Sequence, residues 1–310
     1  MTTAMDPIRI EGKYGAPRVR DGLILCFFRQ DRFGGWAAAV GKAFEHWLSA
    51  VVPKEAVAHA AVGSSANKVE PVDGRTVAAC REQLDAGKAA KRKITGFELG
   101  GPQKLNPDHL FLVWGSLDAE RKAGNTRTNV VEMRLPTEFL DKTGDALAKL
   151  AADLAAILDP DSGYASLALH WSTDSELIRA SDEQVPLALR HPGFDLHHSA
   201  VTRYHLGRRT RGARWWTYLG PELVTAVGGT PAFATLPPEV EVAAVGTGVA
   251  MRVKGLPRPG DVNRKDDLPP LRAMAKLIEP VTFFADEDFG RQVFADEQEL
   301  LARWERRFLD

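Results

Sequence analysis

The segment WWTYLGPELVTAVGG, residues 215–229, combines an aromatic cluster with the start and stop signals of a short helix. Pro221 suits a first helical position, where its missing N–H costs little. Gly228 and Gly229 then end the helix, because glycine takes the left-handed conformation cheaply. One helical face comprises Leu219, Leu223, Val224 and Val227. We therefore predict a core anchor followed by a helix, and no residue here has the chemistry of a catalyst.

Strand and helix patterns continue on both sides of this segment. Continuous apolar runs or strict alternation predict strands at residues 23–28, 109–117, 129–135, 164–172, 240–245, 249–253 and 281–284. The strand at 129–135 is expected to be half-buried, and Gly115 is expected to mark a bulge. Helical spacing predicts helices at residues 36–51, 55–62, 77–84, 147–158, 268–279 and 300–309. Asp267 is the expected cap of the helix that follows it. A long connection is expected over 173–214, with a short helix near residues 175–180.

These elements predict a mixed α+β fold with an antiparallel sheet, or sheets, flanked by helices. The chain has 310 residues, of which 44% are apolar, so it can bury a sizeable core. It shows no internal repeat and no low-complexity linker. We therefore expect one domain over residues 21–310, with a two-lobed form left open. Residues 1–20 are expected to form a polar N-terminal arm that is loose or paired to a sheet edge.

The composition restricts the functional class. The formal net charge is −1, so the charge of the whole protein does not predict binding to nucleic acid or to membranes. The chain has two cysteines, which argues against a disulfide scaffold and fits a reducing compartment. Cys26 lies in an apolar run and is expected to be a buried, inert thiol. The N-terminus has no apolar signal-peptide region, and no run approaches the ~20 apolar residues of a membrane span. We expect a soluble cytoplasmic protein without a membrane partner.

The region 191–205 concentrates residues of the metal-ligand type. They are His191, Asp195, His197, His198 and His205. An enzyme with a metal or nucleotide site in this region is therefore the alternative hypothesis. Against it, the spacing matches no strong zinc pattern, and adjacent histidines point in opposite directions if extended. The glycine pairs 34–35 and 100–101 lack a phosphate-loop pattern, and no GxSxG elbow occurs. We predict no catalytic residue, no cofactor and no metal.

Two polar segments are candidates for binding a partner. Basic and aromatic residues alternate over 203–216, a pattern that can bind single-stranded nucleic acid or simply lead a polar loop into the core. The near-neutral chain makes nucleic acid the weaker reading. The loop 260–267, GDVNRKDD, reads as a binding loop or as a turn followed by a helix cap. The partner-binding candidates are Arg208, Arg209, Arg211, Asp261, Asn263, Arg264 and Asp266.

Six blocks follow one another in a fixed order: MRLPTEFL (133–140), GYASLAL (163–169), HPGFD (191–195), WWTYLGPELVTAVGG (215–229), GLPRPGDVNRKDDLPPLRAMAKLIEPV (255–281) and LLARWERRFLD (300–310). Through these ordered blocks the chain resembles the TsiV-like family of type VI secretion immunity proteins. The resemblance runs from about residue 130 to the C-terminus and extends back toward Asp21. It contains no catalytic signature.

The resemblance implies a cytoplasmic antidote that binds a toxin delivered by type VI secretion. Members of the family are associated with nuclease effectors, including ones with a VRR-Nuc domain. Such a protein is expected to bind its cognate toxin tightly and block the active site or substrate access, without a cofactor. Because the chain is nearly neutral, charge complementarity must be local. Its expected locations are the acidic residues Asp261, Asp266, Asp267, Asp286, Glu287 and Asp288, or the basic loop 208–214 facing an acidic toxin. The oligomeric state is left open.

Overall fold

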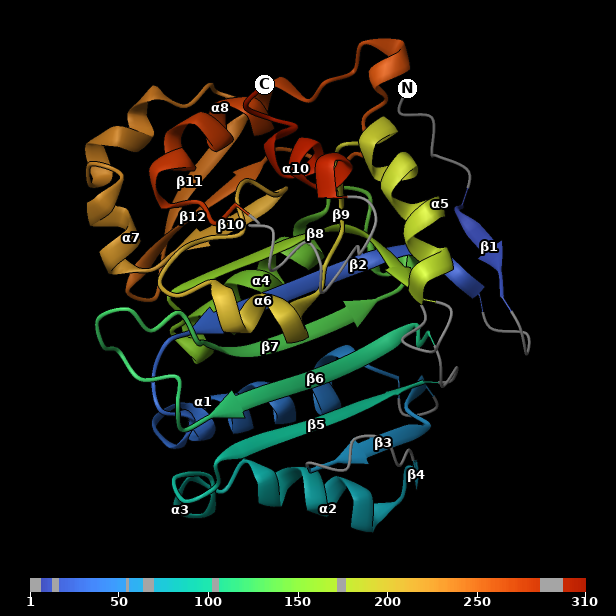
Figure 1. Cartoon of the computed structure of the whole chain (residues 1–310), viewed down its shortest axis with the longest axis vertical. Helices are drawn as coiled ribbons and strands as arrows, with labels where there is room; N and C mark the ends of the chain where they lie inside the picture. The colour runs from blue at the N-terminus through green and yellow to red at the C-terminus, as the bar shows by residue number, and fades with distance from the viewer. Residues whose placement is uncertain are drawn as a thin grey trace.

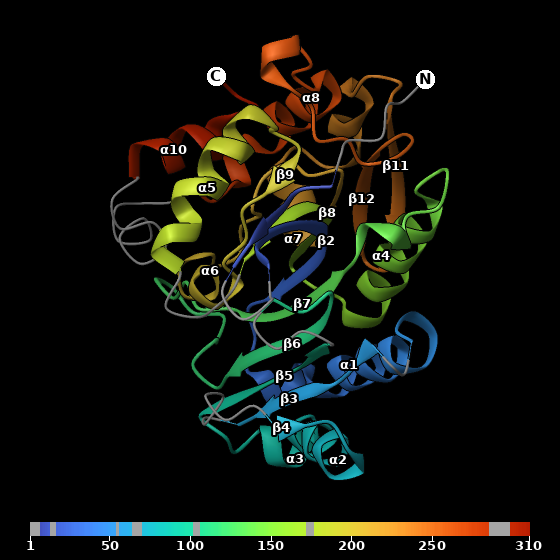
Figure 2. The same ribbon diagram turned by 90° about the vertical axis from the view of Figure 1, so that its right-hand side faces the viewer.

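The computed structural model describes residues 7–12, 17–53, 56–63, 70–101, 106–171, 177–284 and 298–310. Within these ranges the strands form one 12-stranded sheet with helices on both faces (Figures 1 and 2). The strand order is β11 (Val240–Val245), β12 (Gly248–Val253), β10 (Trp216–Leu219), β8 (Ser162–Trp171), β2 (Pro17–Arg29), β7 (Asn129–Leu135), β6 (His109–Ser116), β5 (Ile94–Gly101), β3 (His59–Val62) and β4 (Glu70–Pro71). These pairings are antiparallel. The expected α+β class is confirmed.

The strand β2 lies at the centre of the sheet. It pairs with β8 on one side and with β7 on the other, so its apolar run 23–28 is fully enclosed. The strand begins at Pro17, and residues 17–20 of the expected arm therefore belong to the sheet. A short strand earlier in the arm, β1 (Arg9–Glu11), pairs with β2. Cys26 is buried and free, and burial raises the pKa of its thiol well above the ordinary value, as expected of an inert cysteine.

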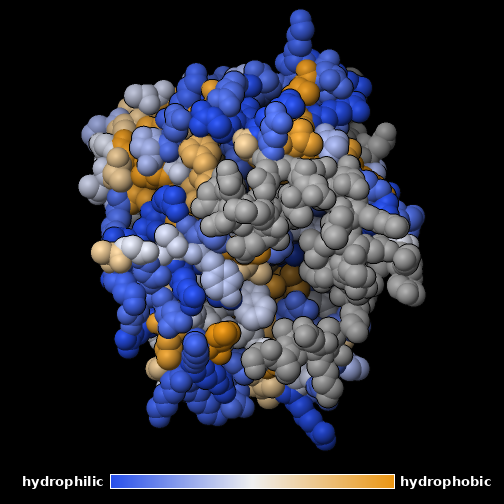
Figure 3. Space-filling view, in the orientation of Figure 1, coloured by the Kyte–Doolittle hydropathy of each residue, from blue (hydrophilic) through white to orange (hydrophobic). Residues whose placement is uncertain are grey.

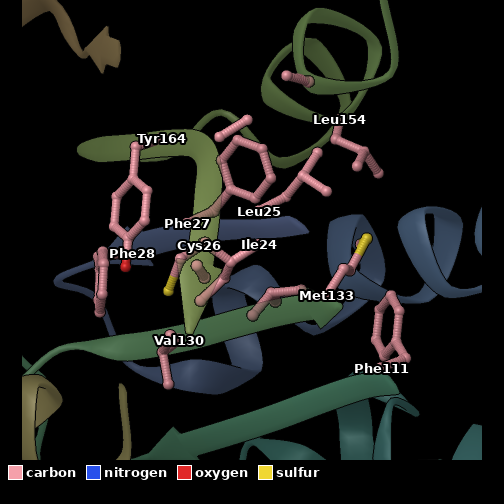
Figure 4. Packing of buried hydrophobic residues seen from close by; sticks show 14 of the residues in the cluster. Ile24, Leu25, Cys26, Phe27, Phe28, Phe111, Val130, Met133, Leu154 and Tyr164 are labelled. Carbon is pink, nitrogen blue, oxygen red and sulfur yellow. The ribbon is translucent and has the colours of Figure 1, made fainter. Parts of the chain in front are cut away.

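One face of the sheet is covered by α1 (Phe33–His46), its continuation over Trp47–Val51, and α4 (Asp145–Leu158). The buried leucines of α4 recur at helical spacing and face the sheet. Figure 4 shows Leu154 of α4 beside Leu25 and Phe27 of β2. The indole N–H of Trp36 donates to the Leu158 carbonyl at 2.5 Å, which joins the two helices. A large apolar core therefore fills this layer.

The opposite face carries α5 (Leu177–Arg190), α6 (Ser199–His205) and α10 (Gln298–Arg306). The helix expected near residues 175–180 is confirmed over 177–180, and residues 175–176 lie outside the described ranges. The helix continues to Arg190 and α6 follows it, so the prediction of a long connection over the rest of 173–214 was wrong. Pro186 lies inside α5, and a proline in a helix interior removes a backbone hydrogen bond, so the sequence pattern does not favour a helix there. This stretch also holds β9 (Phe194–Asp195), which pairs with β8 in parallel. Among the described helices, none combines the length and apolar character needed to cross a bilayer.

The segment 215–229 forms β10 and then α7 (Pro221–Ala226), as its pattern predicts. Trp215 and Trp216 are each 3% exposed, so the aromatic anchor is confirmed. Gly228 and Gly229 have φ of 105° and 74°, which explains why glycine ends this helix. Leu219 is the last residue of β10 and does not belong to the helical face. A second apolar cluster joins α7 to α8 (Pro269–Ile278).

Several local predictions were wrong. Residues 59–62, expected to be helical, form the strand β3. The strand β7 is fully buried because helices cover both its faces. The β5–β6 register passes Gly115 without a bulge, and a Cβ there would lie 2.2 Å from the Phe33 ring. The glycine therefore makes room for an aromatic side chain.

Two further corrections concern α8 and the segment after it. Its cap position is Leu268, with φ of 54°, while Asp267 forms an ion pair with Arg272 at 3.2 Å. Val281 lies in a 3-10 turn, and Thr282 makes only a single bridge to Thr210, so no strand forms at 281–284. The helix predicted at 77–84 is confirmed as α2 (Gly74–Gln83), which is capped by the Asp73 carboxylate and followed by α3 (Ala86–Ala89).

Candidate functional site

The predicted partner-binding residues separate into two groups, one beside the start of β8 and one beside its middle. The Arg209 carbonyl accepts a hydrogen bond from the Ser162 hydroxyl at 2.8 Å, at the start of that strand. The loop that contains Asp261 is attached farther along, where the Gly193 N–H donates to the Pro259 carbonyl and the next residue pairs with Leu167. Five strand residues span roughly 17 Å. The structure therefore does not join these residues into one site.

Arg208 belongs to a surface chain of ion pairs. It contacts Glu222 at the start of α7, and Arg121 contacts the same carboxylate at 2.7 Å and also contacts Asp161. The Arg208 side chain is 47% exposed, so it remains available to a partner. Arg209 donates to the carbonyls at positions 205 and 206 and lies over the Phe283 ring, 4.8 Å from its centroid. Its guanidinium therefore has a structural role.

Arg211 faces the interior. Its side chain is 2% exposed and lies 2.9 Å from Glu305, which is 3% exposed. Burial works against the charge, but Glu305 and Asp195 outweigh it and raise the pKa of Arg211 above its ordinary value. A partner docking on the surface cannot reach this guanidinium without local unfolding.

The loop around Asp261 is held by its own polar groups. The Asp261 carboxylate accepts from the Asn263 N–H at 3.0 Å and from Arg190 at 3.2 Å. The backbones of Asp261 and Asp266 exchange two hydrogen bonds, and Asp266 pairs with Arg258 at 2.5 Å. At the loop tip the Arg264 side chain is 79% exposed, and Asn263 is also exposed. The carboxylates are thus engaged internally, and the tip offers an amide and a guanidinium. Residues 286–288 lie outside the described ranges.

The metal-ligand types of 191–205 make separate contacts, with Asp195 and His197 buried and the other three half-buried. The His191 Nδ1 lies 2.7 Å from the Gly260 carbonyl, and the Asp195 carboxylate pairs with Arg214. His197 Nε2 lies 3.5 Å from Glu132, and burial lowers the pKa of His197 to about 4, against the opposing effect of that carboxylate. Across the described residues, no three His, Cys, Asp or Glu side chains gather so as to hold a metal ion. These residues therefore supply structural contacts.

Four residues that are not among the partner-binding candidates form a cluster of cationic and aromatic side chains. The Arg203 and Tyr204 side chains of α6 lie against Trp114 of β6 and Arg127 of the loop 117–128. Arg203 and Tyr204 fell within the basic and aromatic stretch, but they were not selected as partner-binding residues. Arg127 and Trp114 are distant in sequence, and only the tertiary fold brings them to α6.

Comparisons with known proteins identify the family and the fold that this chain shares. A solved structure of the Pseudomonas aeruginosa T6SS protein PA0821 aligns with a TM-score of 0.79 over 97% of this chain and 87% of that one. At 18% identity, this similarity shows a shared fold. No curated protein matches the sequence. Residues 39–308 match the profile described as TsiV, type VI immunity for VRR-NUC, which covers most of the sheet and the helices on both its faces. The chain therefore belongs to the TsiV family of type VI immunity proteins.

Proposed function

We propose that this protein binds a cognate VRR-NUC nuclease toxin and neutralises it by stoichiometric occlusion. The observation that carries the proposal is the family match, which spans residues 39–308. An immunity role implies action by binding, with no catalytic residue and no cofactor of its own.

The geometry supports a binding role. Of the polar residues that suggested an enzyme, Asp195 and His197 are enclosed in the core, at 0% and 3% exposed, and His191, His198 and His205 are half-buried. The exposed arginines Arg127, Arg208 and Arg264 lie in loop segments that hydrogen bonds hold in place. Surfaces of this kind pay little ordering cost when a partner binds.

A nuclease titration tests the proposal. Purified toxin at a fixed concentration above the dissociation constant is mixed with increasing amounts of this protein, and DNA cleavage is measured. Occlusion predicts a linear loss of activity that ends at one equivalent, together with a one-to-one complex in light scattering. Complete inhibition far below one equivalent indicates catalytic inactivation instead. Unchanged cleavage at several equivalents rejects this toxin as the partner, and an unrelated nuclease serves as the specificity control.

A further inference from the structure

A stack of cationic and aromatic side chains lies where α6 meets the loop 117–128. The Arg203 guanidinium carbon lies 4.0 Å from the Tyr204 ring centroid and 5.5 Å from that of Trp114. Arg127 approaches the same tyrosine ring at 5.6 Å. Arg203 also donates to the Tyr204 hydroxyl. We call Trp114, Arg127, Arg203 and Tyr204 the arginine–tyrosine surface.

Backbone hydrogen bonds hold this surface in place. The Thr128 N–H donates to the Arg203 carbonyl at 2.7 Å, and the Thr126 hydroxyl donates to the Tyr204 carbonyl at 2.7 Å. Within the loop, the Asn125 amide donates to two backbone carbonyls, at 2.8 and 2.7 Å. The loop and α6 are thus organised before any partner binds, which lowers the entropic cost of recognition.

The surface is accessible and locally positive. Tyr204 is 38% exposed, and the Arg127 side chain is 47% exposed with Asp118 as its ion partner. The segments 117–128 and 203–209 contain six basic residues and two acidic ones, and Asp161 and Glu222 from outside them pair with Arg121 and Arg208. Six basic residues therefore face four acidic ones, a local positive excess in a chain whose net charge is −1. The basic residues are Arg121, Lys122, Arg127, Arg203, Arg208 and Arg209. Figure 3 shows the hydrophobic residues of this face in small separate groups, so charge and hydrogen bonding must contribute to binding.

The buried guanidinium of Arg203 adds to the positive charge of the arginine–tyrosine surface. Arg203 is 6% exposed, its Nε has no hydrogen-bond partner, and burial lowers the pKa of its guanidinium. A carboxylate placed over the stack would be attracted to this positive charge, and it would not have to displace a buried ion pair of Arg203. Tryptophan, tyrosine and arginine are also the residues that dominate binding energy at protein interfaces.

We infer that the arginine–tyrosine surface docks onto an acidic surface of the toxin, an inference that rests on the proposed function. Carboxylates are the groups with which nucleases hold divalent cations, so such a partner offers complementary charge. Nucleic acid fits less well. Guanidinium groups flank the Tyr204 ring and compete with base stacking, and the near-neutral chain lacks a broad basic footprint.

Two variants of the full chain test the inference. Arg127→Glu reverses the exposed charge, and Tyr204→Ala removes the ring between the guanidinium groups. Each is expected to raise the dissociation constant for the toxin at least about tenfold in calorimetry. The matched control is Arg81→Glu on α2, whose side chain is 54% exposed and pairs with Glu45 on the other face of the sheet. The control is expected to bind within about twofold of the original chain.

The outcomes separate this inference from the proposed function. If the unmodified chain does not bind the toxin, the proposed function fails and this inference fails with it. If the unmodified chain binds and both variants bind as the control does, only the docking surface is wrong. Circular dichroism checks that each variant folds.

Hydrogen exchange of the unmodified complex provides a second test that does not depend on variants. Protection of amides at 117–128 and 203–209 on toxin binding is expected. Protection confined to other segments, such as 258–266, overturns the assignment. Binding of the toxin-free protein to a DNA oligonucleotide that is lost in Arg127→Glu assigns the surface to nucleic acid and also overturns it.

Discussion

The ion pair between Asp195 and Arg214 provides a quantitative test of how the polar core is stabilised. Asp195 is 0% exposed, and its carboxylate lies 2.8 Å from the Arg214 Nε, 2.7 Å from Nη2 and 2.8 Å from the Tyr164 hydroxyl. Burial works against ionisation, but Arg214 and Arg211 outweigh it and hold the pKa of Asp195 below its ordinary value. The perturbation is Asp195→Ala, which removes the carboxylate and leaves the Arg214 side chain buried.

The expected destabilisation follows from what the substitution leaves behind. An uncompensated buried charge costs about 3–5 kcal/mol, and the orphaned Tyr164 hydroxyl adds about 1 kcal/mol. The sum is a large share of a typical stability of about 5–15 kcal/mol. Replacing both partners by apolar groups is often nearly neutral, so Asp195→Ala with Arg214→Met should be more stable than Asp195→Ala alone.

Urea unfolding followed by tryptophan fluorescence measures these differences, because the chain has seven tryptophans. The matched control is Asp153→Ala, which breaks an exposed pair with Lys149 on α4 and should cost only about 0.3–0.5 kcal/mol. A cost below about 1 kcal/mol for Asp195→Ala refutes the reasoning. So does a double variant that is less stable than the single one.

Three further substitutions test packing and titration in the core. Gly115→Ala places a Cβ 2.2 Å from the Phe33 ring and should destabilise the fold by about 1–3 kcal/mol. The control Gly74→Ala has open space at its Cβ and should leave the melting temperature unchanged or higher. A lower melting temperature for Gly74→Ala than for Gly115→Ala contradicts this account. Leu154→Ala leaves a cavity at a fully buried site and should lower the free energy of unfolding in denaturant by about 2–5 kcal/mol. A loss under about 1 kcal/mol places this residue outside the tightly packed core. Because burial lowers the pKa of His197 to about 4, while the unfolded value is about 6.5, the unfolded chain binds more protons below about pH 6.5. Stability is therefore present above that pH and declines as the pH falls toward 4, by about 2 kcal/mol between pH 7 and 5 from this residue. His197→Gln should lose less stability over that interval, and equal slopes for the two proteins rule out the assignment.

Local patterns predicted most of the strands and the helices α1, α4, α7 and α8. The run at 23–28 and the alternation at 164–172 were sufficient because burial on one or both sheet faces dictates the side-chain period. The segment 59–62 failed because its small and β-branched residues fit either period, and only pairing with β5 decides it. Strand order is likewise a tertiary property, since β2 pairs with strands more than ~100 residues later, at the non-local separations that sequence patterns do not encode.

The candidate site was less accessible from sequence. Their positive charge made Arg208 and Arg211 equal candidates for partner binding. The fold leaves Arg208 exposed and encloses Arg211 beside Glu305. Nothing in the residue pattern distinguishes a solvated arginine from one paired in the core. Arg127 and Tyr204 become neighbours only when the loop 117–128 binds the end of α6.

The central position of β2 has a consequence for synthesis of the chain on the ribosome. The strand emerges early, but both of its flanking partners, β7 and β8, are encoded much later. Roughly a hundred residues separate the end of β2 from the end of β7, an interval of roughly 5–20 s at bacterial elongation rates. During that time the apolar run 23–28 lacks both of its neighbouring strands, so the nascent chain exposes an unpaired apolar segment. The central strand can therefore be enclosed on both sides only after translation has passed β8, and a chain that ends before β8 cannot complete the sheet.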